Sequence, residues 1–265
     1  MKNRILFLLL IFGISCNTPK NSTNSNRSFA KNPVIAHRGA FKKNNFPENS
    51  IAALREAIRL QCTGSEFDVR MSVDDSMLIN HDPHYQQLDI EKTSYHDLSK
   101  IPLSNGETLP TLRQYLLHGA KDNQSTRLIV EIKPSPAGKE RGEIIASKVV
   151  SLVHELNLQS KVVYISFDYN ILKKIRQINP NAITQYLNGD LTPDKLKADG
   201  INGADYHISV FKKNPGWISM AKKSGIALNA WTVNTAEEMN WLLEHKFDYI
   251  TTNEPELLFT ILKIK

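Results

Sequence analysis

The sequence predicts an α/β fold, specifically a TIM (β/α)8 barrel with a small insertion after the second strand. Short apolar runs that are typical of strands alternate with helical stretches, which indicates a parallel sheet. Residues 33–265 are close in number to the roughly 250 that one such barrel needs. Polar and charged residues follow the apolar runs, at the strand ends where these barrels carry their sites. A doubly wound sheet is the alternative.

Nine runs are candidate strands, one more than the barrel needs. The extra run, Met77–Asn80, lies too close to Ser65–Val69 for the crossover helix that a parallel pair requires. Because Asp74–Ser76 form a turn signal between the two runs, we predict a hairpin arm and then an insertion over about residues 82–110. The other candidate strands are Val34–Ala36, Leu128–Ile132, Val162–Ile165, Ala182–Tyr186, Tyr206–Val210, Ile226–Trp231 and Tyr249–Thr251.

Helices are expected between most of these strands. Asn49 is a residue type that caps helices, and we expect it to be the N-cap of the first one. The candidate helices are Ser50–Leu60, Leu112–His118, Glu140–Leu156, Ile171–Ile178, Trp217–Lys223 and Ala236–Glu244.

The N-terminus predicts export from the cytoplasm. Lys2 and Arg4 precede the apolar stretch Ile5–Ile14, which is too short to span a bilayer. Cys16 follows closely, and the whole resembles a bacterial lipoprotein signal, in which the cysteine is lipidated and becomes the new N-terminus. We therefore predict a signal peptide over residues 1–15 and a lipid-anchored protein of the bacterial cell envelope, on the periplasmic or the outer surface.

The residues around Cys16 leave an alternative to lipidation and predict a tether. Gly13 stands where lipoprotein signals usually carry leucine, so plain secretion with an incidental cysteine is the alternative. Residues 16–32 are rich in Asn, Ser, Thr and Lys and too poor in apolar residues to form a core, which predicts a flexible tether. If Cys16 is lipidated, Cys62 has no intramolecular disulfide partner, and residues 33–265 must fold by their core.

Charge and composition narrow the function classes. Apolar residues make up 41% and charged residues 23% of the chain, which is typical of a globular protein. The net charge is +6 at pH 7, but the basic residues are scattered without aromatic interleaving. The sequence therefore predicts no nucleic-acid site, and the mild positive charge favours anionic substrates.

Carboxylates gather at the ends of two candidate strands. Glu66 and Asp68 are two residues apart and share a face of their strand, and Glu131 and Lys133 share a face of another. Three carboxylates in one barrel mouth repel one another unless a cation lies between them. Because oxygen donors suit Ca²⁺ or Mg²⁺ better than Zn²⁺, we predict one divalent cation on Glu66, Asp68 and Glu131. Solvent-facing carboxylates are the alternative.

Two histidines and an arginine also stand at strand ends. His37 and His81 could supply a general base and a general acid, although a histidine is more often structural or solvated. Arg38 is suited to hold a phosphate in a bidentate manner, and an ordinary surface ion pair is its alternative.

The motifs that carry these residues resemble the glycerophosphodiester phosphodiesterase family. The resemblance covers about residues 33–260, and its strength lies in the order and spacing of the full set. The matching segments are IAHRGA, FPENSIAAL, GSEFDVRMSVDDSMLINHDP, IVEIKP, VVYISFD, IALNAWTVNTAEEM and FDYITTNEPELL.

The resemblance assigns catalysis and metal binding. It implies that His37 and His81 are the two catalytic histidines. It also implies that Glu66, Asp68 and Glu131 are the metal ligands. The expected reaction is metal-dependent hydrolysis of a small-molecule glycerophosphodiester to glycerol 3-phosphate and an alcohol, by general acid–base catalysis.

The resemblance also assigns substrate binding. Arg38 matches the phosphate-binding arginine and Lys133 a lysine that helps bind the phosphoryl group. Phe167 and Trp231 match aromatic residues that line the substrate end of the pocket. The nucleophile is either water or the neighbouring glycerol hydroxyl, which would act through a cyclic phosphate.

Two further stretches bear on the site and on substrate range. Glu48 and Asn49 match a motif pair beside the site, whereas HYQQLDIEKTSYHDL in the insertion departs from the threonine-rich family pattern. A phospholipase-type phosphodiesterase that acts on intact lipid is one alternative, although charges in the insertion disfavour an apolar lid. A non-catalytic barrel that binds a phosphorylated ligand is the other, although it predicts an incomplete catalytic set.

Overall fold

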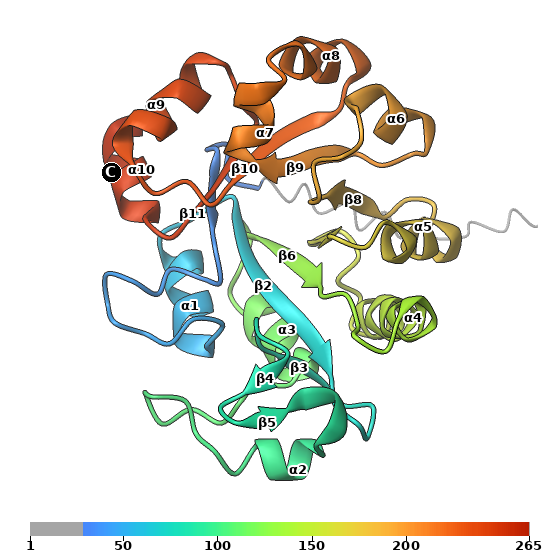
Figure 1. The fold of residues 1–265 in the computed structure, drawn as a ribbon. Helices are drawn as coiled ribbons and strands as arrows, with labels where there is room; N and C mark the ends of the chain where they lie inside the picture. Colours follow the sequence, from blue (N-terminus) through green and yellow to red (C-terminus); the bar gives the residue numbers. More distant parts are fainter. Residues whose placement is uncertain (1–28, 265) are drawn as a thin grey trace, which may run out of the picture.

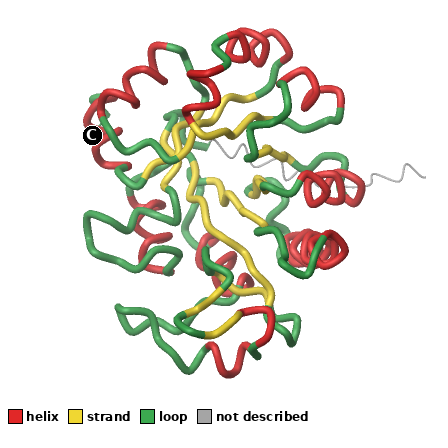
Figure 2. Tube along the Cα trace, in the orientation of Figure 1, coloured by secondary structure: helices red, strands yellow, loops and turns green. Residues whose placement is uncertain are grey.

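The computed structural model describes residues 29–264, and the predicted signal peptide, Cys16 and most of the predicted tether lie outside the described residues. Eight parallel strands form one closed barrel, because β1 is paired with β2 on one side and with β11 on the other. Figure 1 and Figure 2 show the strands inside a ring of helices, which confirms the predicted TIM barrel. The barrel strands are β1 (Val34–Ala36), β2 (Gly64–Met71), β6 (Arg127–Ile132), β7 (Val162–Ser166), β8 (Ile183–Tyr186), β9 (Gly203–His207), β10 (Ala227–Trp231) and β11 (Tyr249–Thr252).

The helices cover the outer faces of the strands. On β2, Phe67 and Val69 face outward into the main core, where the Phe67 ring lies 4.5 Å from that of Tyr115 on α3. Glu66 and Asp68, on the other face, therefore lie inside the barrel, as the alternation predicts. The helices are α1 (Ile51–Arg59), α3 (Leu112–Ala120), α4 (Lys139–Glu155), α5 (Tyr169–Ile178), α6 (Pro193–Ala198), α7 (Ile208–Lys213), α8 (Gly216–Ser224), α9 (Ala236–Glu244) and α10 (Pro255–Leu262). Within residues 29–264, none of the helices has the length and apolar character needed to cross a membrane.

The extra run is an antiparallel hairpin arm, as predicted. Strand β3 (Met77–Ile79) is paired with the end of β2. The following residues form a small unit that projects beyond β2 in Figure 1 and has its own apolar cluster around Ile90 and Leu98. Its elements are β4 (His84–Tyr85), β5 (Leu88–Asp89), the 3-10 helix η1 (Ile90–Lys92) and α2 (Tyr95–Leu98).

One predicted strand is partly wrong. The run Tyr206–Val210 was expected to be extended, but β9 ends at His207 and α7 begins at Ile208. The His207 side chain caps this helix by accepting from the backbone N–H of Ser209. Ile208 and Phe211, three residues apart, then bury one face of the helix, so burial outweighs the strand preference of the β-branched residues.

The predicted N-cap of the first helix is also wrong. Ser50, not Asn49, caps α1 and accepts from the backbone N–H of Ala53 at 3.0 Å. Asn49 precedes the cap with a positive φ of 60°, and its side chain points to Asp68 instead. Both residue types cap helices well, so composition could not distinguish them.

The N-terminal end of the barrel is held by asparagine side chains. Asn32 Oδ1 accepts from the backbone N–H groups of Val34 and Thr63 at 3.1 and 3.2 Å. Asn123 is buried, accepts from the backbone N–H groups of Ser125 and Thr126, and donates to the carbonyl of Gly119 at 2.7 Å. These amides replace backbone hydrogen bonds that the loops lack.

The described chain enters the molecule at this same end. The Ala30 N–H donates to the carbonyl of Ser125, just before β6, at 2.9 Å. The guanidinium of Arg127 lies 4.0 Å from the centre of the Phe29 ring, a cation–π contact. Residues 29–33 therefore lie against the end of the barrel opposite the C-terminal ends of its strands.

Candidate active site

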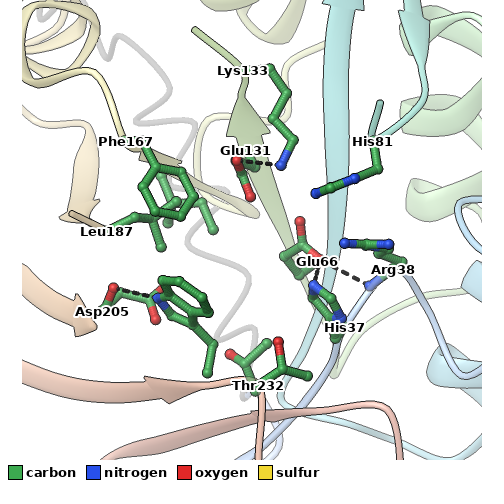
Figure 3. Close-up of a pocket in the computed structure, with 13 residues that line it drawn as sticks. His37, Arg38, Glu66, His81, Glu131, Lys133, Phe167, Leu187, Asp205 and Thr232 are labelled. Carbon is green, nitrogen blue, oxygen red and sulfur yellow. Dashed lines mark hydrogen bonds and ion pairs between the residues drawn. The ribbon is translucent and has the colours of Figure 1, made fainter. Parts of the chain in front are cut away.

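A pocket of about 450 Å³ opens at the C-terminal ends of the barrel strands. It collects eight of the nine predicted site residues, and Figure 3 shows charged side chains on one side and Phe167, Leu187 and Asp205 on the other. The ninth, Asp68, lies fully buried behind the wall. The predicted residues that line the pocket are His37, Arg38, Glu66, His81, Glu131, Lys133, Phe167 and Trp231.

Three buried carboxylates meet beside this pocket. Asp68 on β2 is directly opposite Glu131 on β6 in the sheet register, and Glu66 precedes Asp68 on the same face. One oxygen from each of the three lies within 4.8 Å of the others. Such an all-oxygen group could hold a hard divalent cation.

The electrostatics of this acidic cluster are those of a cation-binding site. Burial, and then the charges of Asp68 and Glu131, raise the pKa of Glu66 well above its usual range. Burial and Asp68 raise the pKa of Glu131 to about 7. Burial alone would also raise the pKa of Asp68, but Lys133 and Asn49 outweigh it and lower the value to about 2. Among the described residues Glu66 Oε1 has no hydrogen-bond partner, so a buried oxygen remains for a cation.

Lys133 and Asn49 hold Asp68 in place. Lys133 Nζ lies 2.8 Å from Asp68 Oδ1 and 2.6 Å from Glu131 Oε1. Asn49 Nδ2 donates to Asp68 Oδ2 at 2.8 Å. Asn49 therefore positions a carboxylate of the site, as its match to the family motif implied, and does not cap the helix.

The turn after β1 positions Arg38. Its backbone has a φ of 53°, and the following Gly39 has a φ of 82°. A side chain on Gly39 would place its Cβ 2.7 Å from the backbone of Ala53, so only glycine fits this turn. As a result the Arg38 N–H donates to Glu66 Oε2 at 2.8 Å, and its guanidinium contacts Glu48 at 2.5 Å. The ion pair with Glu48 lies at the edge of the site and leaves the guanidinium on the pocket wall.

The two histidines have different surroundings. His37 Nδ1 is 2.7 Å from Asn253 Oδ1, so Nδ1 donates and Nε2 is left as the proton acceptor. Burial, and then Arg38, lower the pKa of His37 to about 4. His81 is more exposed, and its Nδ1 lies 2.7 Å from a carboxylate oxygen of Asp82. Burial, opposed by Asp68, lowers the pKa of His81 as well.

The opposite wall of the pocket is aromatic and aliphatic. Phe167 and Trp231 meet edge to face with ring centres 5.4 Å apart. The indole N–H of Trp231 donates to the backbone carbonyl of Asp205 at 2.9 Å, which fixes the plane of the ring. Ile165 and Leu187 complete the apolar part of the wall.

Several residues of the site were not predicted. Asn253 orients His37, and Thr232 and Thr251 line the pocket. Asp205 also lines it, although it lies one residue before the predicted strand Tyr206–Val210. Its inward position follows from alternation along the true β9, which is the signal that could have found it.

The chain matches one protein family over most of its length. The model described as the Glycerophosphoryl diester phosphodiesterase family matches residues 37–257. A glycerophosphodiester phosphodiesterase of Caldanaerobacter subterraneus subsp. tengcongensis is 28% identical over 248 residues, which span 88% of this chain and 98% of that protein.

Solved structures agree with the sequence comparison. The crystal structure of a glycerophosphodiester phosphodiesterase from Parabacteroides distasonis has a TM-score of 0.85 and 37% identity, covering 89% of this chain and 98% of that one. An Oleispira antarctica phosphodiesterase, solved in complex with the product sn-glycerol-3-phosphate, has a TM-score of 0.76 and 22% identity, covering 88% of this chain and 97% of that one. The second likeness concerns the fold.

Proposed function

The chain belongs to the glycerophosphoryl diester phosphodiesterase family, and on that basis we propose that it hydrolyses glycerophosphodiesters to glycerol 3-phosphate and an alcohol. The observation that carries the proposal is the convergence of two histidines, an arginine and a buried acidic cluster on one barrel mouth. Each of these groups has a task in phosphodiester hydrolysis.

The acidic cluster is the proposed site of one divalent cation, Ca²⁺ or Mg²⁺. Glu66, Asp68 and Glu131 would hold it, since their oxygens lie close together and burial and mutual repulsion raise the pKa of both Glu66 and Glu131. A bound divalent cation would supply Lewis-acid stabilisation of charge on the phosphoryl oxygens.

Arg38 and Lys133 are the proposed phosphate-binding residues. Both are cationic side chains on the pocket wall beside the acidic cluster. Arg38 retains guanidinium N–H groups for a phosphoryl oxygen in addition to its contact with Glu48. The Lys133 ammonium, already paired with two carboxylates, would add a third contact to the substrate.

His37 is the proposed general base. With Nδ1 bound to Asn253, its Nε2 can take a proton from the attacking hydroxyl. That hydroxyl belongs either to water or to the neighbouring glycerol carbon, and each of these routes starts with the same proton transfer.

His81 is the proposed general acid. Burial, opposed by Asp68, lowers its pKa in the absence of substrate, which favours the neutral imidazole. The negative charge of the phosphodiester beside it would raise the pKa of His81 and favour the imidazolium that protonates the leaving alkoxide. Its greater exposure suits proton exchange with solvent after each turnover.

Turnover of a panel of glycerophosphodiesters by purified protein tests the function. The panel would include glycerophosphocholine, glycerophosphoethanolamine and glycerophosphoglycerol, with glycerol 3-phosphate as the measured product. We expect turnover that a chelator abolishes and that added Ca²⁺ or Mg²⁺ restores. Absence of turnover under all metal conditions would contradict the activity, and full turnover after chelation would contradict the metal.

The site of action is a separate proposal. We propose that Cys16 is lipidated and holds the protein in the bacterial cell envelope, supported by Lys2, Arg4 and the apolar stretch Ile5–Ile14. Mass spectrometry of the mature N-terminus should find a lipidated Cys16, and Cys16→Ala should move the protein out of the membrane fraction. An unmodified Cys16, or a mature chain that begins elsewhere, would refute it.

A further inference from the structure

Asp205 is a buried carboxyl group that the proposed reaction does not use. It lies on β9 inside the barrel, is 1% exposed, and lines the pocket on the side opposite the charged groups. Among the described residues its Oδ1 has no hydrogen-bond partner. A buried polar atom without a partner costs free energy, and one that faces a pocket can be satisfied by a ligand.

The polar neighbours of this carboxyl group inside the barrel are Asn229 and Thr251. The Thr251 hydroxyl donates to Asn229 Oδ1 at 3.2 Å. Burial and Glu131 raise the pKa of Asp205 well above its usual range, and the Asn229 side chain acts in the opposite direction. Asn229 and Asp205 are directly opposite each other on adjacent strands. Since neither neighbour forms a hydrogen bond with Oδ1, this oxygen remains as a hydrogen-bonding group at the pocket wall.

The surroundings of Asp205 favour a small polyol over a charged ligand. The rings of Trp231 and Phe167 and the side chain of Leu187 offer flat or apolar surfaces to C–H groups. Arg38, Lys133 and Glu66 lie on the other side of the pocket, where the phosphoryl group would bind. The group next to Asp205 is therefore an organic substituent of the phosphate, with at least one hydroxyl to satisfy Oδ1.

We propose that Asp205 is a specificity-determining residue, and that its Oδ1 forms a hydrogen bond with a hydroxyl of the glycerol group. This inference rests on the proposed function, since it assigns the glycerol side of that same pocket. The site would then select glycerol phosphates from other alkyl phosphates by the hydroxyl groups as well as by the phosphate. A cationic head group is the competing occupant, because aromatic rings also attract ammonium groups, although a quaternary ammonium would leave the unpartnered oxygen without a hydrogen bond.

Calorimetric binding to the full chain in the presence of Ca²⁺ tests the assignment. The probes are glycerol 3-phosphate, propyl phosphate, which has the same charge and carbon chain but no hydroxyl, and phosphocholine. The wild-type protein should bind glycerol 3-phosphate roughly 10- to 100-fold more tightly than propyl phosphate, as expected for one or two hydrogen bonds to a buried polar group.

Substitutions of Asp205 distinguish the loss of a hydrogen bond from a change in the shape of the pocket. Asp205→Leu keeps the side-chain shape without a polar atom and should lose most of the preference, while its affinity for propyl phosphate stays within about threefold. Asp205→Asn retains an acceptor oxygen and should restore part of the preference. If circular dichroism shows that Asp205→Leu fails to fold, Asp205→Ala takes its place, with the same expected loss of preference.

Gln185 offers a matched control. It is a buried polar residue on the neighbouring strand β8, also has an oxygen without a hydrogen-bond partner among the described residues, and lines a different cavity inside the barrel. Gln185→Leu should leave the preference for glycerol 3-phosphate unchanged. A loss of preference in this variant too would attribute the effect to general disturbance of the barrel and overturn the assignment.

Other outcomes also decide the matter. An unchanged preference in Asp205→Leu, an equal loss of affinity for all three probes, or a selective loss for phosphocholine would each overturn the proposal. If the wild type hydrolyses glycerophosphocholine but shows no hydroxyl preference, the proposed function stands and this inference fails. If it binds glycerol 3-phosphate selectively without any turnover, the proposed function fails and the glycerol assignment stands.

Discussion

Asn123 and the acidic cluster, buried polar groups at the two ends of the barrel, have different surroundings. At the N-terminal end, neutral amides such as Asn123 are surrounded by backbone donors and acceptors within hydrogen-bonding distance. At the mouth, Glu66 and Glu131 are buried close to another carboxylate, and both pKa values are raised. The first arrangement stabilises the fold, whereas the second costs stability and leaves groups available for a ligand. Activity and stability should therefore respond to substitutions at different ends.

The largest effect on activity is expected from substitution of His37 or His81, the two histidines at the mouth. His37→Ala and His81→Ala should each lower kcat by about 10²- to 10⁴-fold, because each removes a general acid or base. Steady-state kinetics with glycerophosphocholine measures the loss, and thermal unfolding checks that the fold is intact. If His81 is the acid, its variant should recover much of its rate on an aryl phosphodiester, whose leaving group needs little protonation. Equal losses on alkyl and aryl substrates would contradict that role.

A large effect on stability is expected at the opposite end. Asn123→Ala should lower the free energy of unfolding by roughly 2–3 kcal/mol, because several buried backbone groups lose their partner. Denaturant unfolding gives this value, and kcat of the folded variant should stay within about twofold of wild type, since the site lies at the other end. A variant of normal stability, or one with strongly reduced kcat, would contradict the prediction that Asn123 contributes to stability and not to activity.

Removal of a charge at the mouth should raise the free energy of unfolding, whereas Asn123→Ala should lower it. Glu66→Gln keeps an acceptor for the Arg38 N–H but removes one of three crowded carboxylates. The metal-free variant should be more stable than the metal-free wild type by about 1–2 kcal/mol, while its metal affinity falls. Unfolding in chelator and calorimetric titration with Ca²⁺ measure the two effects. Lower stability in chelator would mean that the mouth is not strained by like charges.

The smallest effect on stability is expected for a carboxylate at the mouth end that accepts two backbone hydrogen bonds, and it can be compared with that of the crowded carboxylate Glu66. Glu107, from the insertion, accepts from the N–H groups of Ile51 and Ala52 at 2.8 and 3.0 Å and so caps the start of α1. Glu107→Gln should lower stability by about 0.5–1 kcal/mol, through loss of the charge at a helix N-terminus, with unchanged kcat. Equilibrium unfolding is the measurement. Increased stability would show that carboxylates here repel each other regardless of their partners.

Alternation along strands could be predicted well, whereas the exact ends of elements could not. The pattern placed Glu66 and Asp68 on one inward face, which the structure confirms. It failed at β9, which spans Gly203–His207 and not the predicted Tyr206–Val210, and Asp205 was therefore missing from the predicted site. The short helices α6 and α10, which begin at Pro193 and Pro255, were missed because tertiary burial rather than a long periodic pattern defines them.

Side-chain partners across the fold were the harder part. That β6 brings Glu131 opposite Asp68 depends on strand register, which no local pattern specifies. The contact between His37 and Asn253 joins residues 216 positions apart. The family motifs supplied these residues as a group, but only the folded barrel assigns Asn49 to Asp68 instead of to the helix that follows it.

The entry of the chain beside Phe29 and Arg127 has a practical consequence for handling the protein. Since residues 29–33 lie against the end of the barrel opposite the mouth, an object joined directly before residue 29 would lie beside that end. A bead, a sensor chip or a fused domain attached there would leave the substrate entrance facing bulk liquid. A tag placed directly before residue 29 is thus a suitable handle for immobilising this protein with its mouth accessible.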